Sequence, residues 1–177
     1  MALRARVGLV VAAALLGAPS TAACAPRPEA PKETAEDLVN VAPDDGAMEK
    51  AKADARRTLG LFWSKFDARA AGIDSFSVKV GLPVKDGGAE HLWATPLRRD
   101  SETIVVRIAN DPVYIKDLAY GDEIEVEPEL ISDWAYEKNG KLYGHFTTRA
   151  LLSSLTPEQR AEIEGTLATT PIEQTAK

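Results

Sequence analysis

The fold is decided by the stretch Ile131-Ser132-Asp133-Trp134-Ala135-Tyr136-Glu137-Lys138-Asn139-Gly140-Lys141-Leu142-Tyr143-Gly144-His145. Two runs rich in aromatic residues flank Asn139-Gly140, and an Asn-Gly pair in this position is typical of a type I′ turn, which needs a positive φ at both residues. A two-residue turn sets Lys138 opposite Lys141 and Tyr136 opposite Tyr143. The sequence therefore predicts a β-hairpin with strands at 131–138 and 141–145.

One face of this hairpin is predicted to carry four aromatic or imidazole side chains, those of Trp134, Tyr136, Tyr143 and His145. The first interpretation is that this is the core face, because aromatic side chains dominate core burial. The second is that Tyr136, Tyr143 and His145 stay open as a groove with Trp134 as its floor. Phenol and imidazole groups around an apolar cleft suit a sugar ring or a peptide. These four residues are the candidate binding site, and the core interpretation is favoured.

Before the hairpin, the apolar pattern changes from a helical period to a strand period. A helix capped by Asp44 or Asp45 is predicted to run to about Phe66, and its apolar stripe includes Trp63. Its remaining stripe positions are Met48, Ala51, Ala55, Leu59 and Phe62. Alternating residues then predict strands at 76–82, 90–95, 104–108 and 121–127, with Pro96 ending the second. Trp63 and Trp134 are expected in the core.

After the hairpin, 149–155 has a helical pattern, and Thr156-Pro157 is a typical start for a further helix. The whole order predicts an α+β fold: an N-terminal helix on a curved, mainly antiparallel sheet of about six strands, then short C-terminal helices. A small open barrel is the related alternative. We expect one domain at 44–167 and a disordered tail at 168–177.

Residues 1–23 have the pattern of a secretory signal rather than of a folded element. Arg4 and Arg6 precede a ten-residue apolar run at 7–16, and small residues follow it. A ten-residue helix is about 15 Å long, about half of a bilayer's hydrocarbon thickness, so this run is not expected to be a stable membrane span. The sequence therefore predicts export.

The single cysteine, Cys24, follows Thr21-Ala22-Ala23 at the expected cleavage point. This arrangement resembles a bacterial lipobox, which implies a lipid on Cys24 and a membrane as a partner; ordinary cleavage nearby is the alternative. Ala25 is not the Asp associated with inner-membrane retention of enterobacterial lipoproteins, which favours the outer membrane. The segment 24–43 contains four of the eleven prolines and no aromatic residue. It is interpreted as a flexible tether, or simply as a disordered N-terminus.

Seven local strings together resemble the YegJ-like family, the domain of unknown function 2314. They are Ala55-Arg56-Arg57-Thr58-Leu59 followed by Phe62-Trp63; Phe76-Ser77-Val78-Lys79-Val80; Glu90-His91-Leu92-Trp93; Ile108-Ala109-Asn110-Asp111-Pro112; Gly121-Asp122; Ile131-Ser132-Asp133-Trp134; and Gly140-Lys141-Leu142-Tyr143-Gly144 with Thr147, Arg149 and Leu151. The resemblance runs over about 47–155. It implies a compact bacterial α+β domain and no particular activity.

Three residues are the candidates for catalysis, namely His91, Asp133 and His145. A histidine near a carboxylate can act as a general base, but Glu90 and His91 are adjacent on a strand and are expected on opposite faces. Asp133 is the best candidate for a buried carboxylate, paired with Arg107 or Arg149 in a structural role or acting as a catalytic acid. A structural or binding role is favoured for His91, and a structural role is favoured for Asp133.

Composition and missing motifs narrow the classes of function. The chain has 177 residues and a formal charge of −6, which becomes −8 if 1–23 are removed, so nucleic acid is not an expected partner. We expect no metal site and no cofactor, because the predicted domain has two histidines, no cysteine and no phosphate-binding glycine motif. The alternating acids at Glu123, Glu125, Glu127 and Glu129 are interpreted as a solvated strand face.

Three classes of function remain open at this point. The favoured one is a lipid-tethered binding or structural module of the cell envelope that contacts a protein or a cell-wall glycan. The alternative is a small envelope hydrolase that uses a carboxylate and a histidine. Neutralisation of a toxin is open to any small acidic domain, and no residue supports it specifically.

Overall fold

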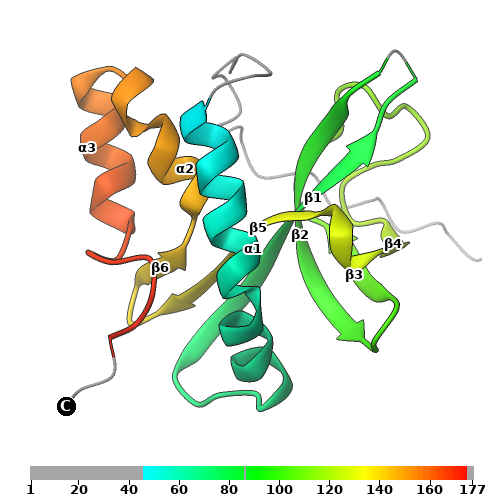
Figure 1. Cartoon of the computed structure of the whole chain (residues 1–177), viewed down its shortest axis with the longest axis horizontal. Helices are drawn as coiled ribbons and strands as arrows, with labels where there is room; N and C mark the ends of the chain where they lie inside the picture. The colour runs from blue at the N-terminus through cyan, green and yellow to red at the C-terminus, as the bar shows by residue number, and fades with distance from the viewer. Residues whose placement is uncertain (1–45, 86, 175–177) are drawn as a thin grey trace, which may run out of the picture.

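In the computed structural model, which describes residues 46–85 and 87–174, an antiparallel sheet is combined with helices (Figure 1). The elements in order are α1 (Gly46–Asp67), β1 (Ile73–Pro83), β2 (Ala89–Arg99), β3 (Ile104–Ile108), β4 (Glu123–Val126), the 3₁₀ helix η2 (Pro128–Leu130), β5 (Ile131–Lys138), β6 (Lys141–Gly144), α2 (Phe146–Leu151), the 3₁₀ helix η3 (Leu152–Ser154) and α3 (Pro157–Thr166). The predicted α+β class is confirmed. The predicted signal, Cys24 and the tether lie outside the described residues.

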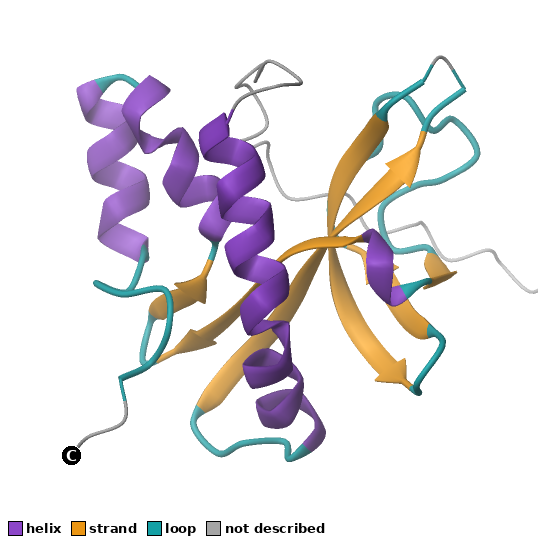
Figure 2. Cartoon of the chain, in the orientation of Figure 1, coloured by secondary structure: helices purple, strands orange, loops and turns teal. Residues whose placement is uncertain are grey.

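The sheet is open, with the strand order β4-β3-β2-β1-β5-β6 and antiparallel pairing throughout. The strands cross at steep angles in Figure 2, as expected of a strongly twisted sheet. The first and last strands, β4 and β6, are not paired with each other, so the sheet is not closed into a barrel. No helix in the described ranges is long and apolar enough to cross a membrane.

The predicted helix is α1, and it lies across one face of the sheet (Figure 1). Its buried residues are Ala51, Ala55, Thr58, Phe62 and Trp63, which agree with the predicted stripe and add Thr58. The helix packs against β5, the first strand of the hairpin, and against α2. The 3.6-residue period of the sequence is therefore explained by the face that α1 turns toward these two elements.

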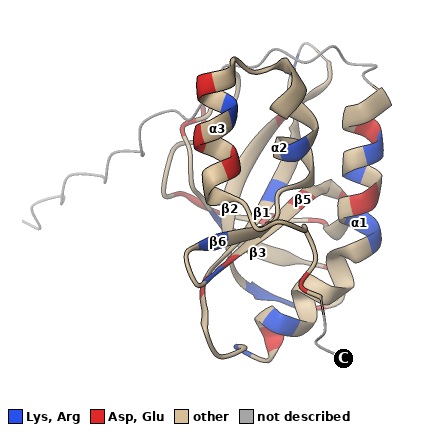
Figure 3. Ribbon diagram, turned by 90° about the vertical axis from the view of Figure 1, so that its left-hand side faces the viewer, with Lys and Arg blue, Asp and Glu red and all other residues tan. Residues whose placement is uncertain are grey.

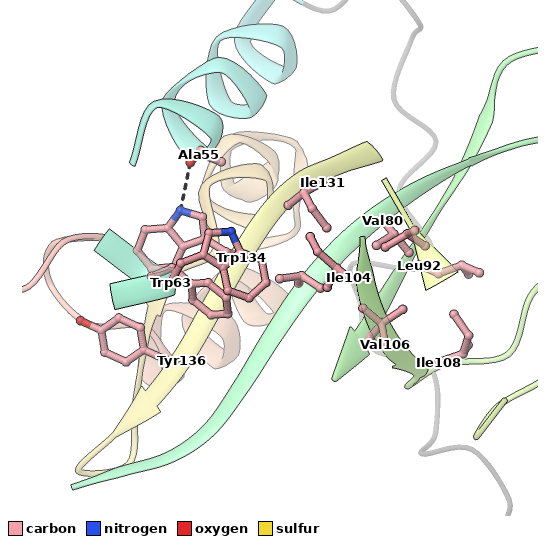
Figure 4. Packing of buried hydrophobic residues seen from close by; sticks show 14 residues of the cluster. Ala55, Trp63, Val80, Leu92, Ile104, Val106, Ile108, Ile131, Trp134 and Tyr136 are labelled. Carbon is pink, nitrogen blue, oxygen red and sulfur yellow. Dashed lines mark hydrogen bonds between the residues drawn. The ribbon is translucent and has the colours of Figure 1, made fainter. Parts of the chain in front are cut away.

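The core is built around Trp134, which is 1% exposed (Figure 4). Its indole N–H donates to the main-chain oxygen of Ala55 at 3.0 Å and also approaches the Thr58 hydroxyl at 3.2 Å. Its ring is stacked with Tyr136 at a centroid distance of 5.9 Å. Trp63 is 7% exposed, so the prediction that both tryptophans belong to the core is confirmed.

The hairpin has the predicted register, with Tyr136 opposite Tyr143 and Lys138 opposite Lys141. Asn139 and Gly140 have φ values of 54° and 68°, the conformation for which the Asn-Gly pair was predicted. The strand β6 ends at Gly144, one residue earlier than expected, because the next residue leaves the sheet.

The strand β2 continues through Pro96 to Arg99, so the prediction that Pro96 ends it is wrong. The pairing with β3 shifts register between Pro96 and Arg98. At a bulge the hydrogen bonds between two strands are locally interrupted, so a residue without an N–H group, such as Pro96, is tolerated there. The strand continues beyond the bulge.

The chain after α3 does not match the predicted tail. The helix begins with the expected cap, in which the Thr156 hydroxyl accepts from the Gln159 N–H. Beyond it, Ala168 is buried and donates to the Leu142 carbonyl at 2.9 Å, and the Pro171 carbonyl accepts from the Gly144 N–H at 2.7 Å. Residues 168–174 therefore lie along β6, the edge strand of the sheet, and the prediction of disorder is wrong for them. The two hydrogen bonds to β6 join main-chain groups, which the side-chain pattern does not encode.

Candidate functional site

The four residues predicted to form an aromatic groove are only partly brought together. Trp134 and Tyr136 are almost fully buried, and Tyr143 is stacked on Tyr136 with 5.0 Å between ring centroids. Loss of water around the phenol, together with the charge of Glu173, raises the pKa of Tyr136. These three residues share one face of the hairpin as predicted, and the first two belong to the core.

His145 is separated from that face. Its φ is 51°, a left-handed conformation, and this turns the chain out of the sheet just before α2. The imidazole lies 4.7 Å from the Trp93 ring, centroid to centroid, and its Nδ1 is 2.9 Å from the Thr148 hydroxyl. The prediction that His145 shares the aromatic face is therefore wrong, because the strand geometry on which it relied ends at Gly144.

A groove of about 520 Å³ lies beside the buried aromatic pair. It is lined by Trp134 and Tyr136, by Leu61, Ser64 and Lys65 of α1, and by Ile172, Glu173 and Gln174. Glu173 forms ion pairs with Lys65 and Lys138, and these cations lower the pKa of its carboxyl group to about 2. The groove thus differs in composition from the predicted one, since its outer wall is the C-terminal segment rather than Tyr143 and His145.

Asp133 is fully buried, as predicted, but its partners are not arginines. Its carboxylate accepts from the N–H groups of Trp134 at 2.8 Å, Phe146 at 3.2 Å and Thr147 at 2.7 Å, and from the Thr147 hydroxyl at 2.7 Å. Two of these N–H groups belong to the first turn of α2. Burial raises the pKa of Asp133, and the hydrogen bonds from Thr147 and Trp134 act in the opposite direction. The carboxylate therefore fixes the start of α2 to β5.

The two arginines proposed as partners of Asp133 have other roles. Arg149 donates from Nε to the Gly144 carbonyl at 2.9 Å and from Nη2 to the Ala168 carbonyl at 2.8 Å. Arg107 is paired with Glu123 at 2.7 Å on the surface. The prediction of an ion pair is wrong because backbone donors satisfy the carboxylate instead, and helix starts supply such donors locally.

Glu90 and His91 project to opposite faces, as expected for neighbours on a strand. The side chain of Glu90 accepts three main-chain hydrogen bonds, from Val113 at 2.5 Å, Tyr114 at 3.0 Å and Ile115 at 3.1 Å. It is 9% exposed, whereas Val113 is 54% exposed and Tyr114 is 73% exposed. A buried carboxylate thus holds a loop whose apolar side chains point into solvent.

His91 lies against β1 and β5 on the other face. Its Nδ1 is 2.9 Å from the Ser132 hydroxyl, which is also 3.1 Å from the Lys79 carbonyl. The ring lies directly over Gly81, where an added Cβ would be 2.9 Å from its Cε1 atom. Partial loss of water and the positive charges of Lys52, Lys79 and Arg56 lower the pKa of His91 to about 4, although the nearby Glu49 acts to raise it.

These positions determine what the candidate catalytic residues can do together. The carboxylate of Asp133 is hydrogen-bonded to backbone and threonine donors, and both histidines are hydrogen-bonded to hydroxyl groups. A hydrolase of the expected kind needs a carboxylate that orients a histidine beside an accessible nucleophile. Ser132 does stand beside His91, but it is 1% exposed. Among the described residues, no three of His, Cys, Asp and Glu are grouped closely enough to hold a metal ion.

Sequence reasoning did not identify Ser132, or the exposed pair Val113 and Tyr114, as parts of a site. Ser132 is the unpaired residue at a register shift between β1 and β5, since Lys79 pairs with Asp133 and Val80 pairs with Ile131. No local signal marks that irregularity. For the loop, the signal was present: two apolar residues follow Asn110-Asp111-Pro112, a typical loop sequence, where they have no strand or helix period to bury them.

Comparison with known proteins places the chain in a family. Residues 45–169 match the family model described as "Uncharacterized protein conserved in bacteria (DUF2314)". The "Uncharacterized protein YegJ" of Escherichia coli (strain K12) is 32% identical over 136 residues, which cover 76% of this chain and 86% of that protein. The "Putative ankyrin repeat protein NMB1133/NMB1171" of Neisseria meningitidis serogroup B (strain ATCC BAA-335 / MC58) is 30% identical over 126 residues, 67% of this chain and 49% of that protein. No solved structure gives a significant match. With the family model covering the whole sheet and α1 to α3, the chain belongs to the DUF2314 family of uncharacterised bacterial proteins.

Proposed function

We propose that the protein is a binding module of the bacterial cell envelope, exported and held to a membrane by a lipid on Cys24. The proposal is supported by the signal-like residues 1–23, by the position of the single cysteine, and by a proline-rich segment before the domain. A domain held by a tether can reach a partner above the membrane surface. For this role the domain needs a surface that contacts the partner and does not need a set of catalytic residues.

The observation that carries the binding function is the loop tip formed by Val113 and Tyr114. These two adjacent side chains and Leu61 are the large apolar residues that stand exposed among the described residues. Three hydrogen bonds to Glu90 hold the backbone of this tip, and the Lys116 ammonium adds one to the Val113 carbonyl at 2.5 Å. A fixed backbone loses little conformational freedom on binding, which increases the affinity of the residues that it presents.

The chemistry of this tip favours a protein as the partner over a glycan. Tyr114 is 73% exposed and Val113 is 54% exposed on a loop, and an exposed aromatic anchor typically fills a pocket on another protein. Sugars are more often bound in a concave site. We therefore assign the tip as the anchor that inserts into an envelope protein.

Replacing both Val113 and Tyr114 with Ser is expected to reduce recovery of the partner at least tenfold. An anchor residue typically contributes about 2 kcal/mol or more, which corresponds to about 30-fold in affinity. The measurement is affinity purification of the full chain from envelope membranes, followed by quantitative mass spectrometry. The melting temperature should hardly change, because the removed side chains are exposed.

Leu61→Ser is the matched control, since Leu61 is 49% exposed on α1 and is not part of the loop. It should leave recovery unchanged. If the double variant captures the same proteins as the unchanged chain, or if Leu61→Ser loses them equally, the tip is not the contact surface.

The lipid part of the proposal has its own test. Replacing Cys24 with Ser is expected to abolish labelling by palmitate and to move the protein from the detergent phase to the aqueous phase, because the thiol is the only attachment point in the chain. Equal labelling and partition of the two forms would mean that the signal is cut in the ordinary way. The binding surface would then act from a protein that is not anchored.

A further inference from the structure

The C-terminal segment, residues 168–174, forms one wall of the groove of about 520 Å³ beside β5. Main-chain hydrogen bonds hold this segment on β6 as far as Pro171, whose carbonyl accepts from the Gly144 N–H at 2.7 Å. Beyond Pro171 the segment reaches the C-terminal half of α1, and Figure 3 shows it passing near the end of that helix. The volume of the groove is within the range of about 300–1,000 Å³ that is typical of sites for small molecules.

A single carboxylate of this segment, that of Glu173, bridges two lysines from different elements. Lys65 of α1 is 2.8 Å from Oε2, and Lys138 of β5 is paired with Oε1. All three side chains are 28–30% exposed, so the cluster is partly sheltered from water. In the described part of the chain, neither lysine is paired with a second carboxylate. The two ammonium groups therefore converge on a position that one carboxylate fills.

The rest of the groove is mainly apolar. Trp134 and Tyr136 form its floor, and Leu61 and Ile172 add aliphatic surface. Leu61 is 49% exposed, so part of this apolar wall is accessible to solvent. The Lys65 ammonium lies 5.4 Å from the centroid of the Tyr136 ring, which places the lysine pair directly beside the apolar surface.

We propose that this groove binds a small amphiphile with an apolar body and one carboxylate, and that Glu173 occupies the place of the ligand's carboxylate. The ligand carboxylate would accept charge-assisted hydrogen bonds from Lys65 and Lys138, as Glu173 does. Its apolar body would lie against Leu61 and the aromatic floor. The site is separate from the loop tip, because neither Val113 nor Tyr114 lines the groove.

The position of Glu173 makes it a competitor of such a ligand. Glu173 is only two residues beyond Pro171, where the segment is still bonded to β6, so its carboxylate is present at the site at a high effective concentration. A free carboxylate must displace it before it can reach the lysines. Binding to the unchanged chain is therefore expected to be weak, and removal of the Glu173 charge is expected to strengthen it.

The experiment measures binding of octanoate to the full chain by isothermal titration calorimetry at neutral pH. Glu173→Gln keeps the length of the side chain and removes its charge, so both lysines become available to the probe. We expect this variant to bind octanoate at least about tenfold more tightly than the unchanged chain. Replacing Lys138 with Gln in the same variant should reverse the gain.

Two controls separate this site from general effects of charge and of apolar surface. Glu162→Gln makes the same change of charge at an exposed position of α3 that does not line the groove, and it should leave the affinity unchanged. The probe 1-octanol has the same apolar chain without a charge. It should bind equally to the unchanged chain and to Glu173→Gln.

The unchanged chain gives a test that does not depend on how the variant folds. Octanoate at high millimolar concentration should displace Glu173 and shift the NMR signals of the Ile172 methyl groups and of the Lys65 side chain, whereas 1-octanol should not shift those of Lys65. The proposal is overturned if octanoate leaves these signals in place, or if Glu173→Gln binds it no more tightly than Glu162→Gln. Glu173 would then only fasten the C-terminal segment to α1 and β5. Neither result would affect the loop tip at Tyr114.

Discussion

Replacing Trp134 with Ala is expected to lower the free energy of unfolding by about 3–5 kcal/mol, the usual cost of removing a large aromatic side chain from a core. Trp134 is 1% exposed and contacts the rings of Phe62 and Phe146 at centroid distances of 5.7 and 5.5 Å. Such a loss is a large part of the total stability of about 5–15 kcal/mol for a domain of this size. Urea unfolding followed by circular dichroism measures it directly.

Trp134→Phe is the control for this change. It keeps an aromatic ring in the same place but removes the N–H that donates to Ala55, so we expect a smaller loss of about 1–2 kcal/mol. An Ala variant with the same unfolding midpoint as the unchanged chain would show that the packing of α1 on β5 does not hold the domain together.

Replacing Gly144 with Ala is expected to cost about 2–5 kcal/mol, from the sum of an unfavourable backbone conformation and overpacking. Gly144 has a φ of 77°, and an added Cβ would lie 2.6 Å from the Cε3 atom of Trp134 and even closer to its carbonyl oxygen. The backbone cannot move away freely, because the Gly144 N–H and carbonyl are bonded to Pro171 and Arg149.

Gly140 provides the comparison within the same hairpin. It also has a positive φ, 68°, but no atom lies within 4 Å of an added Cβ. Gly140→Ala should therefore cost only the backbone part, about 1–2 kcal/mol. Thermal unfolding that is equal for the two variants would contradict the close approach of Trp134 to Gly144.

The sequence predicted the elements of the fold because local rules controlled them. The Asn139-Gly140 turn fixed the register of the hairpin, and the spacing of apolar residues identified α1 and the four strands before the hairpin. Two features of the fold were not predicted from the sequence. Residues 168–174 are held by main-chain hydrogen bonds to β6 and by side-chain contacts with Lys65, Lys138 and Arg149, which are distant in the sequence. The strand β2 passes through Pro96 at a bulge. Neither feature leaves a local pattern in the sequence.

The candidate site was predicted less well than the fold. Successive side chains of a strand point to opposite faces, and this correctly predicted that Glu90 and His91 lie on different faces. The same reasoning failed for His145, because its left-handed backbone ends the alternation of side chains. Asp133 was correctly expected to be buried, yet its partners are N–H groups of α2 rather than arginines. Pairing between residues that are far apart in sequence depends on the tertiary fold, and residue type alone does not determine it.

The central claim is that the tip at Val113 and Tyr114 contacts an envelope protein. The most direct measurement places a photo-crosslinking amino acid at position 114, and in a matched strain at Leu61, in the full chain expressed in its bacterium. Irradiation of intact cells is expected to give a defined covalent adduct with one protein from position 114 and none from position 61. The account is contradicted if position 114 gives no protein adduct, or if both positions give the same set of adducts.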